Sequence, residues 1–111
     1  MSFLFIYIVP TFSPANLTAK NVSSTELAFQ WDAVKEENTY EAVRGYVVYV
    51  TESENPTVFV KNITTDASTL SIAIDDLKKF TTYTLYIKAF TVDLGVKSLT
   101  VNVSTAEDGK S

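Results

Sequence analysis

The sequence contains no cysteine and no histidine. Without cysteine the chain has no disulfide framework and no thiol chemistry, although many extracellular domains also lack disulfides, so the compartment stays open. Without histidine it lacks the usual general base near neutral pH and the commonest ligand of transition metals. Both absences argue against an enzyme, and we expect no catalytic residue, no cofactor and no metal site.

Basic residues and long hydrophobic runs are also scarce. Nine lysines and arginines face 13 acidic residues, the net charge is −4, and Arg44 is the single arginine. Such a chain offers no basic field to a phosphate backbone, so nucleic acid is not an expected partner. The apolar run from Phe3 to Val9 is far shorter than the roughly 20 residues that a membrane-spanning helix needs. We therefore expect contact with a membrane only through a parent protein.

Residues 1–13 are predicted to lie outside the folded core. Three explanations of this leader stay open. As a secretory signal it lacks a positively charged start, and its apolar part is short. It would also fit an extra strand or a disordered tail. Finally, its residue types have pyrimidine-rich codons, so the segment would fit translated intron sequence ahead of an exon that begins near Pro14.

Hydrophobic residues make up 46% of the 111 residues, and β-branched and aromatic types dominate them, which favours strands. From Leu17 onward apolar residues recur with a period of two, without the 3.6-residue period of a helix. The predicted strands lie at 17–20, 25–31, 45–51, 58–63, 69–74, 83–90 and 98–104. In the last of these, Leu99, Val101 and Val103 are expected to face inward.

Seven short strands that each bury one face are best accommodated by two sheets stacked about 10 Å apart. The sequence therefore predicts an all-β fold, a seven-stranded immunoglobulin-like β-sandwich over residues 14–107, followed by a frayed tail at 108–111.

The pattern resembles the fibronectin type III domain. The resemblance rests on Pro14, Leu17, Trp31, Tyr46, Leu77, Tyr83, Ala89, Gly95, Ser98, Thr105 and Glu107. Residues 77–83, LKKFTTY, are similar to the family's Leu-x-Pro-x-Thr-x-Tyr signature, with Lys79 in place of the proline. An immunoglobulin domain would instead carry two cysteines and a tryptophan on the third strand.

The resemblance implies fibronectin type III topology, with Trp31, Tyr46, Leu77 and Tyr83 as structural core residues. It also implies a tyrosine corner, in which the hydroxyl of Tyr83 turns back to the backbone where the chain crosses between the sheets.

The resemblance also implies a non-catalytic module of the kind found in extracellular receptor and adhesion proteins, and with it an extracellular or cell-surface location. Four Asn-x-Ser/Thr sequons agree with that location, at Asn16, Asn21, Asn62 and Asn102. The chain has six asparagines, and 25 of its 111 residues are serine or threonine, so about one or two sequons would arise by chance. Four sequons are a modest excess.

Two surfaces are candidates for protein contact. Val47, Tyr49, Tyr86 and Phe90 are expected on the exposed side of one sheet, with Phe59 beside them, although cross-strand aromatic pairs also stabilise a sheet that has no partner. The loop at 32–44 is the second candidate, with Tyr40 as its anchor or with a spacer role only. An integrin-binding Arg-Gly-Asp tripeptide is absent from the sequence.

The acidic pairs Glu36–Glu37 and Asp75–Asp76 belong to no multi-ligand loop, so we interpret them as solvated charges. The function predicted best is a non-catalytic extracellular interaction or spacer module of a multidomain receptor or adhesion protein, with other proteins or neighbouring domains as partners. Two alternatives stay open: an accessory domain of a secreted carbohydrate-active enzyme, and a module of a cytoplasmic structural array.

Overall fold

A computed structural model describes residues 13–35, 42–95 and 97–107. The predictions for Tyr40, for Glu36 and Glu37, and for the segments 1–12 and 108–111 lie outside these residues. The strands are β1 Ala15–Asn21, β2 Leu27–Asp32, β3 Gly45–Glu52, β4 Asn55–Asp66, β5 Ser71–Ile74, β6 Thr82–Phe90 and β7 Val101–Ser104. None of the described ranges forms a helix long and apolar enough to cross a membrane.

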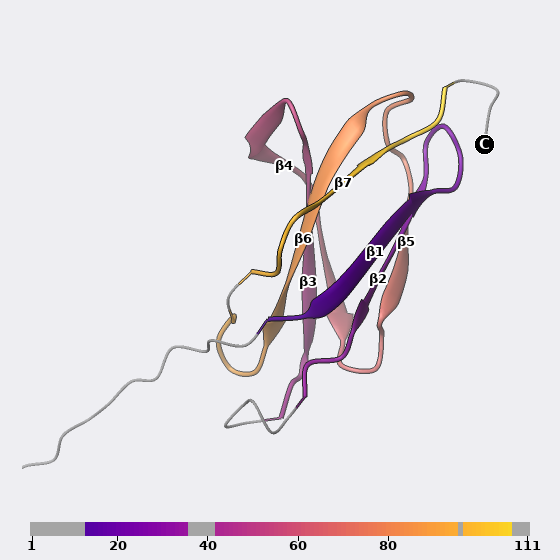
Figure 1. The fold of residues 1–111 in the computed structure, drawn as a ribbon. Coiled ribbons are helices and arrows are strands. Elements are labelled where there is room, and N and C mark those ends of the chain that lie inside the picture. Colours follow the sequence, from indigo (N-terminus) through magenta and orange to yellow (C-terminus); the bar gives the residue numbers. More distant parts are fainter. Residues whose placement is uncertain (1–12, 36–41, 96, 108–111) are drawn as a thin grey trace, which may run out of the picture.

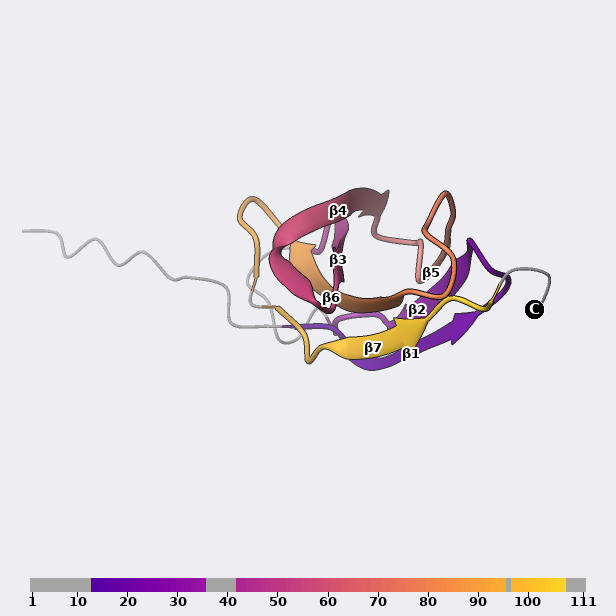
Figure 2. The same cartoon turned by 90° about the horizontal axis from the view of Figure 1, so that it is seen from above.

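The strands form two antiparallel sheets, which confirms the predicted all-β sandwich (Figure 1). One sheet has the order β1-β2-β5 and the other the order β4-β3-β6-β7. Strand β7 also lies beside β1, where the two sheets approach each other (Figure 2). The outer side of β3 and β6, away from β1, β2 and β5, is therefore a continuous surface of the four-stranded sheet.

The core lies between the sheets and follows from the alternation of apolar residues in β2, β3 and β6. Its fully buried members include Leu27 and Phe29 of β2, Tyr46, Val48 and Val50 of β3, and Tyr83, Leu85, Ile87 and Ala89 of β6. Trp31, at the inner face of β2, packs its ring against those of Phe29 and Tyr46, with centroid distances of 5.5 Å in both cases. Because side chains alternate across each strand, the intervening residues are directed outward.

The prediction that Leu99 faces inward is wrong. Its side chain is 87% exposed, and β7 begins only at Val101. Before that point the buried hydroxyl of Ser98 accepts a hydrogen bond from the Ile87 N–H at 3.0 Å and donates one to the Leu99 carbonyl at 2.9 Å. These bonds turn Ser98 inward. Val101 lies three positions further on, an odd spacing, so the strict alternation that would turn Leu99 inward is interrupted.

Strand β4 is longer than the predicted 58–63. It forms the edge of the four-stranded sheet, pairing with β3 alone, and its register shifts near Val50 and Thr51 of β3. Pro56 fits this edge position because its missing N–H breaks no ladder. Residues 55–60 are all exposed, so an alternation of burial does not mark this half of the strand.

Candidate functional site

The predicted contact residues on strands lie together on the outer side of the four-stranded sheet. We call Val47, Tyr49, Phe59, Tyr86 and Phe90 the aromatic face. Tyr49 lies directly opposite Tyr86 in the β3–β6 pair, and their rings stack with centroids 4.9 Å apart and 17° between the planes. The ring of Phe59 is 5.5 Å from that of Tyr49. Tyr49 and Tyr86 are half-buried, whereas Phe59 is 48% exposed.

Two lysines cover the stacked pair. Lys88 Nζ lies 5.5 Å from the centre of the Tyr49 ring, and Lys97 Nζ lies 5.2 Å from that of Tyr86. Ammonium groups at this distance are attracted by the negative ring face. Burial, and then the neighbouring Tyr86, raise the pKa of the Tyr49 hydroxyl above its ordinary value. Lys88 lies on the same face as Tyr86 because the two are two residues apart on β6. Lys97 follows a turn, so its position over the Tyr86 ring could not be predicted from alternation.

Phe90 stands apart from the stacked rings and covers Gly45. The two residues are paired across β3 and β6, and a Cβ added to Gly45 would stand 2.8 Å from Cζ of the Phe90 ring. An aromatic ring over a strand glycine shields backbone that has no side chain of its own. Phe90 thus has a partner inside the domain. Its use as a protein contact stays a prediction, as does that of Tyr40.

The four sequon asparagines are all exposed, but they differ in what their amides do. Asn16 has a positive φ of 53° and donates from Nδ2 to the Asp32 carboxylate at 2.6 Å. Asn102 Oδ1 accepts the Thr84 hydroxyl at 2.8 Å. Asn21 ends β1. Asn62, on β4, lies directly opposite Tyr49 and therefore on the aromatic face.

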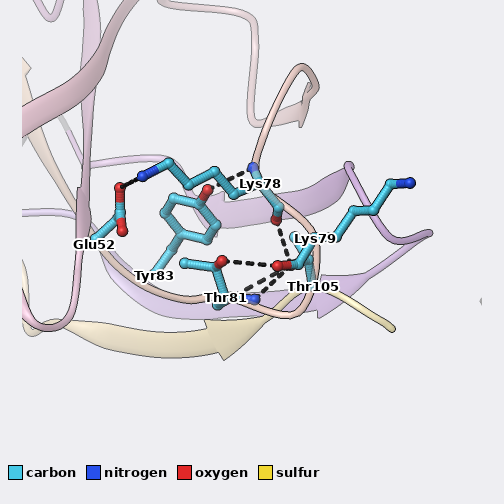
Figure 3. Close-up of polar contacts among 6 residues, drawn as sticks. All are labelled: Glu52, Lys78, Lys79, Thr81, Tyr83 and Thr105. Carbon is cyan, nitrogen blue, oxygen red and sulfur yellow. Dashed lines mark hydrogen bonds and ion pairs between the residues drawn. The ribbon is translucent and has the colours of Figure 1, made fainter. Parts of the chain in front are cut away.

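The four residues predicted as structural core are buried. The Tyr83 hydroxyl accepts the Lys78 N–H at 2.8 Å, which is the geometry of a tyrosine corner (Figure 3). Tyr46 does something similar at the other end of the sandwich, because its hydroxyl accepts the Val34 N–H at 3.1 Å. Lys78 also pairs its Nζ with Glu52 at 3.1 Å, and this contact raises the pKa of its ammonium group.

Thr105 completes the corner, and the sequence did not predict this role. Its buried hydroxyl donates to the Lys78 carbonyl at 2.7 Å and accepts the Thr81 N–H at 3.0 Å (Figure 3). Both backbone groups of Lys78 are thus paired by side chains from later strands and segments. The one sign of this role in the sequence is a threonine directly after the last predicted strand, and that sign does not identify the groups to which it bonds.

The acidic residues that the structure describes form no evident ion site. Asp75 pairs with Lys61, with 3.4 Å between Oδ1 and Nζ, and it is exposed, as is Asp76. Across the described ranges, no group of three or more aspartates or glutamates is arranged to hold a metal ion.

The stacked tyrosines should stabilise the sheet measurably. We expect a double-mutant cycle of Tyr49→Ala and Tyr86→Ala to give a coupling free energy of about 0.5–1.5 kcal/mol, the usual range for an aromatic pair. Urea unfolding of the four proteins measures it. A coupling near zero would mean that the stacking contributes nothing to stability, which would favour an external contact as the role of these rings.

The chain matches the family model described as fibronectin type III domain over residues 12–104. It is 32% identical over 97 residues to human contactin-4, an alignment that covers 86% of this chain and 9% of that protein. It is 28% identical over 103 residues to the human cell adhesion molecule DSCAM, covering 90% and 5%. The third fibronectin III domain of human KIAA0343 protein superposes with a TM-score of 0.80 at 22% identity, covering 98% of this chain and 93% of that one. The chain therefore spans less than a tenth of these curated relatives, and the structural likeness concerns the fold.

Proposed function

Because this chain belongs to the fibronectin type III family, we propose that it is a non-catalytic extracellular module of a multidomain cell-surface receptor or adhesion protein. In that setting it spaces its neighbours and makes contacts with other proteins or with adjoining domains. The relatives support this proposal, since they include contactin-4 and a protein described as a cell adhesion molecule, each much longer than one domain.

The observation that carries the spacer role is the position of the two ends. Ala15, at the start of β1, lies opposite Asp32 at the end of β2, whereas Ser104, at the end of β7, lies opposite Thr82 at the start of β6. Because neighbouring strands are antiparallel, these are opposite ends of the sandwich (Figure 1). Strands of eight or nine residues are about 30 Å long, so a module that receives the chain at one end and passes it on at the other separates its neighbours by about that distance.

The exit end is also firmly tied to the sandwich. The Ala106 N–H donates to the Ser23 carbonyl at 3.2 Å, and the Phe80 N–H donates to the Ala106 carbonyl at 3.1 Å. Because backbone hydrogen bonds hold the chain as far as Ala106, the last residues of the domain have a fixed direction relative to the sandwich, which restricts the orientation of a following module. A spacer of this kind needs no catalytic residue.

Location is the part of the proposal that is tested most directly. An antibody raised against the folded domain should label intact cells that make the parent protein, and brief protease treatment of those cells should remove the label. A cytosolic protein of the same cells, probed in parallel, controls for leakage. Labelling that requires permeabilised cells would contradict an extracellular location and favour the cytoplasmic array.

The spacer role needs a second measurement. Replacing this domain in the parent by another fibronectin type III domain of equal length should preserve the separation of the flanking epitopes, measured by energy transfer between labels. Deleting the domain should shorten that separation by about 30 Å. If replacement and deletion gave the same separation, the domain would not act as a spacer.

A further inference from the structure

The aromatic face contains the sequon at Asn62 beside open ring surface. Asn62, Tyr49 and Tyr86 stand in one row across β4, β3 and β6, because each is directly opposite the next in register. Side chains opposite one another across a sheet have Cβ atoms about 5 Å apart. Asn62 therefore rises from the sheet next to the Tyr49 ring, and the exposed ring of Phe59 adjoins Tyr49 from the same strand as Asn62.

The geometry of the sequon also favours modification at this asparagine. Ile63 packs toward the core, so Asn62 and Thr64 both face outward, and both are exposed. Within the described ranges no hydrogen bond engages the side-chain amide of Asn62. The side-chain amide of Asn16 is bonded to Asp32, and that of Asn102 to Thr84. Strand β4 is a sheet edge, so a bulky group on it meets one neighbouring strand only.

We propose that Asn62 carries an N-linked glycan whose first N-acetylglucosamine packs over Phe59 and Tyr49. The proposal rests on the extracellular location proposed above. The donor is a lipid diphosphate-linked oligosaccharide. A bond forms between Asn62 Nδ2 and the anomeric carbon, the bond from that carbon to the diphosphate oxygen breaks, the lipid diphosphate leaves, and one amide proton is lost to a base.

Sugar chemistry suits this surface. One side of a pyranose ring presents C–H groups, which are apolar and weakly positive, and the faces of Tyr and Phe rings are apolar and negative. If the sugar removes about 50 Å² of ring surface from water, the folding equilibrium constant rises about eightfold. Lys88 and Lys97 lie over the Tyr49 and Tyr86 rings, and the glycan would in the same way cover the exposed ring of Phe59.

The test uses this chain secreted from mammalian cells, with a signal peptide, in three forms: unchanged, Thr64→Ala and Thr18→Ala. Thr64→Ala removes the sequon at Asn62 but keeps the asparagine, and Thr18→Ala does the same for Asn16 as a matched control. Peptide mapping after glycosidase treatment in heavy-oxygen water reports occupancy of each asparagine. We expect Asn62 to be occupied, and Thr64→Ala to lower the folding equilibrium constant about eightfold in urea unfolding. Thr18→Ala should leave it within about twofold.

Phe59→Ala separates packing from mere attachment. In the Phe59→Ala background, adding Thr64→Ala should no longer lower the folding equilibrium constant, because the glycan has lost the ring on which it packs. In unglycosylated protein from bacteria, Thr64→Ala should change that constant by no more than about twofold. Three results would overturn the proposal: an empty Asn62 beside another occupied sequon, a glycan whose stabilisation persists in Phe59→Ala, or a dimer in sedimentation that Phe59→Ala dissolves, which would make a second copy the occupant. Each of these leaves the extracellular location intact, because surface labelling tests that separately.

Discussion

Gly45→Ala should lower the free energy of unfolding by about 3 kcal/mol, at the upper end of the usual range for overpacking. Gly45 is buried at the start of β3, between Asp66 of β4 and Phe90 of β6. An alanine Cβ would overlap the Thr65 carbonyl oxygen and stand 2.8 Å and 2.9 Å from two ring atoms of Phe90. The ring is able to turn away, but the carbonyl belongs to the backbone of β4, and moving it distorts the β3–β4 pairing.

Chemical and thermal unfolding measure this effect, and a loss of this size lowers the midpoint by roughly 10 °C or more. The companion variant is Phe90→Ala in both backgrounds. Removing the ring relieves one of the two clashes, so it should restore part of the stability lost in Gly45→Ala, but not all of it. Full recovery would show that the ring alone excludes a side chain here, and an unchanged midpoint in Gly45→Ala would refute the close approach itself.

The sequence predicted what depends on alternation. Where a strand is paired on both sides and buried on one face, as β3 and β6 are, residues two apart share an environment. The faces of Tyr49, Tyr86 and Tyr83 follow directly from that. The pairing of Tyr49 with Tyr86 needed only that β3 and β6 be neighbours, which the family resemblance implied.

Features that depend on register or on single hydrogen bonds were not predictable in this way. Leu99 faces outward because Ser98, three positions before the start of β7, bonds inward, which a hydropathy pattern does not record. The length of β4 was underestimated because the exposed half of an edge strand has no buried face to mark it. The need for glycine at position 45 arises from a carbonyl 20 residues away in the chain, and it becomes visible only when β3 and β4 are paired.

The tyrosine corner yields the second large effect. Tyr83→Phe should cost about 1–2 kcal/mol, because it leaves the Lys78 N–H without its partner in a site where Tyr83 is 1% exposed. Thr105→Val keeps the shape of the side chain but removes the hydroxyl that donates to the Lys78 carbonyl, with a longer contact to the Thr81 carbonyl, and that accepts the Thr81 N–H. We expect it to cost more, about 2–3 kcal/mol.

The two substitutions should be less than additive. Both side chains hold the same short segment, since Tyr83 pairs with the N–H of Lys78 and Thr105 with its carbonyl (Figure 3). Once one of these bonds is lost, the segment is freer to expose its remaining backbone groups to water, which reduces the cost of losing the other. The double variant should therefore lose at least 0.5 kcal/mol less than the sum of the single losses, on the scale typical of residues in one network.

Urea unfolding of the four proteins gives this cycle, and amide hydrogen exchange locates it. The Lys78 amide should exchange faster in Tyr83→Phe, and the Thr81 amide faster in Thr105→Val. Tyr86→Phe is the matched control, because it removes a tyrosine hydroxyl from half-buried β6 surface while the stacked ring stays in place, and it should change stability by no more than about 0.5 kcal/mol. If Tyr83→Phe were as mild as this control, or the two losses simply added, the two side chains would not act on the crossing as a unit.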